Sequence, residues 1–140
     1  MNGRLVFQLS LTGLAMGVAT VFAIPPLVEP VCWLVIFPLC AYFIARRAPG
    51  SYFLHGLLLG LLNSVWITGA HVLLFERYLA HHPGEAAMMA QMPLSPKAMM
   101  LITGPIVGVV SGIVMGILAL IVHRLVSTRR RGRACSPARP

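Results

Sequence analysis

Apolar residues form four long runs along the 140-residue chain, separated by short segments that contain Pro, Gly and Arg. A helix that crosses the hydrocarbon core of a bilayer needs about 20 predominantly apolar residues. We therefore predict an all-α integral membrane protein in which residues 1–126 form a single transmembrane helical domain. The four transmembrane helices are expected at about residues 5–24, 29–45, 52–75 and 98–123.

The second run is the shortest, and it contains Pro38. A proline inside a helix removes one backbone hydrogen bond and bends the helix axis. We expect a short and kinked second span, with a re-entrant or tilted segment as the alternative to a full crossing.

The first run has a different alternative. Arg4, the apolar stretch and Val21-Phe22-Ala23 are similar to a secretory signal peptide with a small-residue cleavage site. However, the stretch is longer than the about 7–15 apolar residues of a signal, and Pro25-Pro26 follow at once. These features favour a retained membrane helix over a cleaved signal.

Composition narrows the class of protein further. Hydrophobic residues make up 58% of the chain and charged residues 10%, whereas a soluble domain averages about 45–50% apolar and about 25% charged residues. These values exclude a water-soluble domain and a disordered chain. Three scattered cysteines also make no disulfide framework.

The distribution of cations predicts an orientation. If both termini are cytoplasmic, only Arg77 and Lys97 lie outside, together with all three glutamates. The positive-inside rule therefore favours this topology, and we expect the bacterial cytoplasmic (inner) membrane. The net charge of +8 then reflects orientation, and no nucleic-acid partner is expected. The inner cations are Arg4, Arg46, Arg47, Arg124, Arg129, Arg130, Arg131, Arg133 and Arg139.

The segment 127–140 is rich in Arg, Ser and Pro and has nothing to bury, so we expect a disordered cytoplasmic tail. A cation close to an anionic membrane surface contributes about 1 kcal/mol to binding. We expect the tail to bind anionic lipid headgroups through Arg129, Arg130, Arg131 and Arg133.

Small residues recur every four positions in three of the runs, which places them on one ridge of each helix. Helices in lipid gain no hydrophobic energy by meeting, so close backbone approach at small residues drives their packing. An interior glycine also costs about 1 kcal/mol of helix propensity, which implies a tight interface in return. We expect self-association to use part of this ridge. The glycines are Gly13, Gly17, Gly56, Gly60, Gly104, Gly108, Gly112 and Gly116.

Asn63 lies near the middle of the third span, where its amide needs a partner other than lipid. We expect an interhelical hydrogen bond beside the glycine ridge. The alternative is a transporter or pore subunit, channel-like or holin-like, in which Asn63, Thr68 and Ser111 line a polar path. No carboxylate lies at mid-membrane in the sequence, which disfavours proton-coupled transport.

The connection 77–97 is the longest loop, and residues 86–92 in it could form a helix on the membrane surface. Its histidines, carboxylates and methionines are ligand types for zinc or copper. A metal-binding module at the outer face is therefore a further alternative. The candidate ligands are His81, His82, Glu85, Met89 and Met92.

No catalytic or cofactor-binding pattern is visible, because the chain has no GxSxG motif, no CxxC pair and no phosphate-binding loop. We therefore expect a non-enzymatic packing or assembly component that forms a homo-oligomer or joins a larger membrane complex.

Overall fold

The computed structural model describes the backbone of residues 1–134 and the side chains of residues 1–128, and all regular secondary structure in this part is helical. Four of the helices are long and apolar enough to cross a membrane, which confirms that part of the prediction. The helices are α1 (Gly3–Phe22), α2 (Glu29–Arg47), α3 (Tyr52–Leu73), α4 (Phe75–His81), α5 (Pro83–Ala90) and α6 (Pro96–Ala134).

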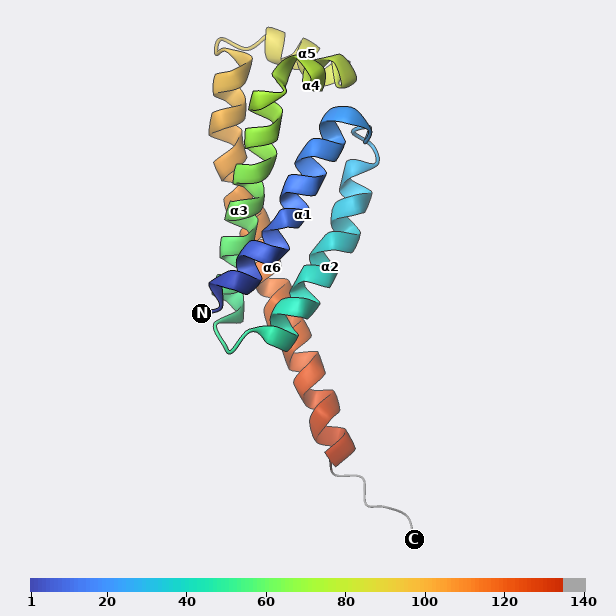
Figure 1. Cartoon of the computed structure of the whole chain (residues 1–140), viewed down its shortest axis with the longest axis vertical. Coiled ribbons are helices and arrows are strands. Elements are labelled where there is room, and N and C mark those ends of the chain that lie inside the picture. The colour runs from blue at the N-terminus through green and yellow to red at the C-terminus, as the bar shows by residue number, and fades with distance from the viewer. Residues whose placement is uncertain (135–140) are drawn as a thin grey trace.

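The four long helices run alternately up and down, so the N-terminus and the end of α6 lie at the same end of the molecule (Figure 1). We call this the arginine end, because it carries Arg4, Arg46, Arg47 and Arg124. The other end carries α4 and α5 and all three glutamates, and we call it the glutamate end. The most extensive contact joins α3 to α6, with α1 packed on α3 and α2 packed on α6.

The main hydrophobic core lies toward the arginine end, where residues from all four long helices meet. Ile44 of α2, Leu59 of α3 and Met115 of α6 are fully buried there, with Leu5 and Val6 of α1 beside them. The first half of α2 contains no buried residue, whereas the second half contains four. The bundle is therefore tight at the arginine end and more open toward the glutamate end.

Most of the predicted helix ends lie within two residues of those observed, and the largest difference is at the end of α6. α2 is one helix of 19 residues that continues through Pro38 to Arg47, rather than ending at residue 45. α6 extends to Ala134, so residues 127–134 are helical where we expected disorder. Arginine is a good helix former, and cations at a helix C-terminus are favourable to the helix dipole. Residues 135–140 of the expected tail lie outside the described part.

The expected surface helix is present as α5, although it begins and ends earlier than residues 86–92. α4 is an addition to the expected elements, because α3 ends at Leu73 and a new helix starts at Phe75. Its signal was the spacing of Phe75, Tyr78 and Leu79, which gives a short helix one apolar face.

Candidate functional site

A cluster of polar and aromatic side chains lies at the glutamate end, where α1, α3, α4 and α5 meet. The ring of Tyr78 stacks on His71 with 4.1 Å between the ring centroids, and His82 stacks on Tyr78 at 4.3 Å. Thr20 hydrogen-bonds to His71, and Glu85 hydrogen-bonds to Tyr78. We refer to these five residues as the Tyr78 cluster.

The hydrogen bonds assign the protons of the cluster on the α1 side. The Thr20 hydroxyl donates to the backbone oxygen of Met16 at 3.0 Å, so its oxygen is left to accept. His71 Nε2 lies 2.8 Å from this oxygen and therefore acts as the donor. The contact links α1 to α3, two of the helices that are long and apolar enough to cross a membrane.

On the outer side of the cluster, the Tyr78 hydroxyl donates to Glu85 Oε2 at 2.5 Å. Burial raises the pKa of the Tyr78 phenol, and the hydrogen bond to Glu85 raises it further. Tyr78 therefore stays protonated near neutral pH and acts as a donor. It is not suited to act as a base or a nucleophile.

His82 is almost completely buried, with 1% of its surface exposed. Its Nδ1 donates to the backbone oxygen of Tyr78 at 3.0 Å, which leaves Nε2 as an acceptor. Within residues 1–128, Nε2 has no hydrogen-bond partner. The cluster thus holds one unsatisfied polar atom, at a cost of about 1–3 kcal/mol.

The candidate metal ligands do not converge on one point. The side chain of His81 is exposed and bonds to the backbone oxygen of Arg77, while His82 is buried and Glu85 is held by Tyr78. Met89 packs beside the apolar residues around Tyr78, and Met92 is exposed. Among the residues that the structure describes, no three His, Cys, Asp or Glu side chains are placed to share a metal ion.

The glycines of α6 face α3 of the same chain in an antiparallel register. A Cβ built on Gly104 would meet the side chain of Thr68, and one on Gly108 would meet Ser64. A Cβ on Gly60 would overlap the backbone of Gly112. One on Gly56 would in the same way overlap Gly116. Each step of four residues up α3 matches a step of four residues down α6, so four layers of small residues lie in contact.

The two glycines of α1 face α3 on its other side. A Cβ on Gly13 would lie 2.6 Å from Asn63 Oδ1, and one on Gly17 would lie 2.9 Å from the Cα of Ile67. The expected hydrogen bond of Asn63 is not made by its Oδ1, which is buried without a partner in the described part. The backbone of Gly13 approaches so closely that Asn63 packs against it instead of bonding to it.

The polar residues of the pore alternative have different surroundings. Asn63 lies against α1, Thr68 lies against Gly104 of α6, and Ser111 donates to the backbone oxygen of Gly108 in its own helix. The lipid-binding candidates Arg129, Arg130, Arg131 and Arg133 lie outside the residues whose side chains are described.

Sequence reasoning missed Thr20 and Tyr78 as members of a polar cluster. The only signal was the presence of His71 and His82 on either side of Tyr78 in the sequence. Comparison with known proteins adds no information to this geometry, because no family model, no curated protein and no solved structure matches the chain.

Proposed function

We propose that the protein is a non-enzymatic integral membrane protein of the cytoplasmic membrane that serves as a packing component of a larger membrane complex. Both termini face the cytoplasm in this proposal. Small residues hold α3 against α6 within the chain, and the proposal is carried by the apolar faces that this packing leaves exposed on α2 and α6.

The separation of charge between the two ends supports the orientation. The arginine end carries Arg4, Arg46, Arg47 and Arg124, and the glutamate end carries only Arg77 and Lys97 as cations. Under the positive-inside rule, the arginine end faces the cytoplasm.

The contact between α3 and α6 changes where a partner would bind. Gly104, Gly108, Gly112 and Gly116 all face α3 within the chain, so this ridge is not free to bind a second copy. The exposed apolar faces nearer the glutamate end remain, with Val107 of α6 60% exposed and Leu34 of α2 74% exposed. We propose that a partner protein binds at these faces through apolar helices of its own.

Crosslinking in native membranes followed by purification in mild detergent tests the proposal. We expect the full chain to be recovered with a partner in a fixed stoichiometry, and Val107→Trp on α6 to reduce this recovery severalfold. Val65→Trp on α3 is the matched control, because Val65 is 63% exposed but lies on another helix. Recovery of the wild-type chain as a monomer without a stoichiometric partner would contradict the proposal.

A further inference from the structure

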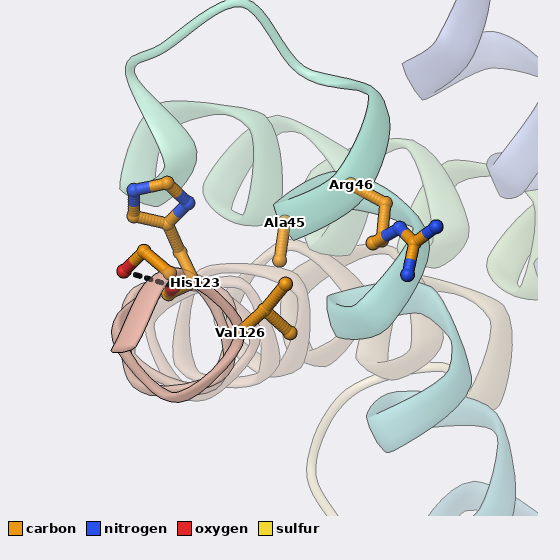
Figure 2. Close-up of a pocket in the computed structure, with 5 residues that line it drawn as sticks. Ala45, Arg46, His123 and Val126 are labelled. Carbon is orange, nitrogen blue, oxygen red and sulfur yellow. Dashed lines mark hydrogen bonds between the residues drawn. The ribbon is translucent and has the colours of Figure 1, made fainter. Parts of the chain in front are cut away.

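A small hollow opens at the arginine end, between the last turn of α2 and the part of α6 that leaves the bundle (Figure 2). Its volume is about 70 Å³. One water requires roughly 10–15 Å³ by this measure, so the hollow has room for several waters or for one tetrahedral oxyanion. It is lined by Ala45, Arg46, His123, Val126 and Ser127.

Arg46 and His123 lie on opposite sides of the hollow, and Ala45 and Val126 lie between them (Figure 2). The guanidinium of Arg46 is held by Tyr42, since Nη1 donates to the hydroxyl at 3.0 Å and Cζ lies 5.5 Å from the ring centroid. A guanidinium has five N–H donors, so the others remain for a ligand.

The imidazole of His123 stacks on the ring of Tyr52, with 3.9 Å between centroids and an angle of 20° between the ring planes. It makes no hydrogen bond within residues 1–128. Ser127 uses its hydroxyl proton inside α6, where it donates to the backbone oxygen of His123 or Arg124, each at 2.9 Å. A ligand in the hollow would therefore be recognised by Arg46 and His123.

No carboxylate side chain is present at the arginine end to neutralise its arginines. The sequence contains no Asp, and Glu29, Glu76 and Glu85 are all at the glutamate end (Figure 1). The counter-charge must therefore come from outside the side chains of this protein. An anion bound in the hollow would supply this counter-charge to Arg46.

The position of the hollow indicates which anion this is. Arg46 is next to the last residue of α2, at the level where the apolar helices reach the membrane surface. Toward the membrane interior, the neighbouring turns of α2 expose Leu39 and Phe43. A ligand with acyl chains could lay them along these side chains while its phosphate occupies the hollow.

We propose that the hollow binds the phosphate of an anionic phospholipid, with Arg46 and His123 as its hydrogen-bond donors. The inference rests on the proposed insertion of the chain in a membrane, and it does not depend on the proposed role in assembly. Specific lipid binding would then occur at a site formed by α2 and α6, in addition to the lipid binding expected of the basic segment at the end of α6.

The test uses the full chain reconstituted in phosphatidylcholine vesicles with and without phosphatidylglycerol. Immobilisation of spin-labelled phosphatidylglycerol is compared with that of spin-labelled phosphatidylcholine, at high salt so that diffuse attraction is screened. Arg46→Gln and Arg47→Gln form the matched pair, because both residues are exposed, adjacent and stacked on an aromatic ring of α2. Only Arg46 lines the hollow.

We expect Arg46→Gln to bind phosphatidylglycerol at least about fivefold more weakly than Arg47→Gln, because charge-assisted hydrogen bonds are lost in addition to the charge. Val126→Phe should have a similar effect, since it fills the hollow without a change of charge. His123→Gln should weaken binding as well. Should Val126→Phe fail to fold, the two exposed arginine positions still decide the question.

Three results would overturn the inference. The first is equal binding of phosphatidylglycerol by the Arg46 and Arg47 variants, which would mean that diffuse charge alone accounts for the lipid binding. The second is wild-type binding by a folded Val126→Phe variant. The third is displacement of the lipid by inorganic phosphate, which would assign the hollow to a free oxyanion. If the wild-type chain does not float with vesicles of either composition, the proposed membrane insertion itself fails.

Discussion

Tyr78 connects the short helices α4 and α5 to the bundle of long helices through its two faces and its hydroxyl. His71 of α3 stacks on its ring, as does His82 at the junction of α4 and α5, and Glu85 of α5 accepts a hydrogen bond from its hydroxyl. The residue is 6% exposed, and it packs with Val21 and Met100. At the residue scale, one side chain therefore fixes the position of α4 and α5.

The raised pKa of Tyr78 predicts a dependence of stability on alkaline pH. The phenol has a pKa of about 10 in an unfolded chain and a higher one in the folded protein, so its contribution is present below about pH 10. It is lost as pH rises through the folded value. We expect the stability of the wild type to fall more steeply above this pH than that of Tyr78→Phe.

Ultraviolet absorbance of tyrosinate in detergent, taken as wild type minus Tyr78→Phe, checks the prediction directly. Glu85→Gln is a useful second variant, because it removes the carboxylate that accepts the hydrogen bond of the phenol and leaves the burial of Tyr78 unchanged. It should lower the pKa of Tyr78 relative to the wild type. A Tyr78 signal that titrates at the same pH in Glu85→Gln and the wild type would contradict this assignment.

At the scale of elements, the pair α3 and α6 shows why glycine spacing matters. The close contacts extend from Gly56 and Gly116 at one end to Thr68 and Gly104 at the other. At this distance the two backbones gain dispersion energy and weak Cα–H contacts. The sequence showed the two ridges, but it did not show that they face each other along their whole length.

Gly60 and Gly69 give a matched test of this contact within α3. A Cβ at Gly60 would overlap the backbone of Gly112, whereas a Cβ at Gly69 would meet nothing within 4 Å. Gly60→Ala should destabilise the protein by about 1–3 kcal/mol through overpacking. Gly69→Ala should be neutral or stabilise it by up to about 1 kcal/mol through helix propensity.

Unfolding in detergent micelles, followed by circular dichroism, compares the two variants. Gly69→Ala should unfold at a denaturant concentration equal to or slightly above that of the wild type. Gly60→Ala should unfold at a clearly lower denaturant concentration. Equal stabilities for Gly60→Ala and Gly69→Ala would mean that α3 and α6 do not pack as closely as the structure has them.

At the scale of the whole molecule, the up-and-down order of the helices collects Arg4, Arg46, Arg47 and Arg124 at one end and the three glutamates at the other (Figure 1). A bilayer around the bundle would separate these two groups of charge. The orientation of the protein is then a property of the entire chain, because every connecting segment contributes to the charge of one end.

Two glycines allow the orientation to be tested with little disturbance of the fold. Gly3 is at the arginine end and Gly84 is at the glutamate end, and a Cβ at either would meet nothing within 4 Å. In a variant with the native cysteines replaced, we expect Gly84→Cys to react with a membrane-impermeant maleimide in intact cells. Gly3→Cys should react only after lysis, and the reverse pattern would invert the proposed topology.

The sequence by itself determined the class of protein, the number of long helices and most of their boundaries. These follow from local properties, namely runs of apolar residues of membrane-spanning length and the breaks between them. The end of α6 was missed because helix propensity continues through the arginines after the apolar run stops. α4 was missed because a short amphipathic turn resembles a loop in a sequence.

Only the tertiary structure decided which side chains meet. It placed Thr20 beside His71, Asn63 against Gly13 without a hydrogen bond for its Oδ1, and Arg46 across a hollow from His123. The members of each set come from helices far apart in the chain. Their contact depends on how far each helix is rotated about its axis and on the angles at which the helices cross. Runs of hydrophobic residues do not specify these angles, whereas backbone contact at small residues does.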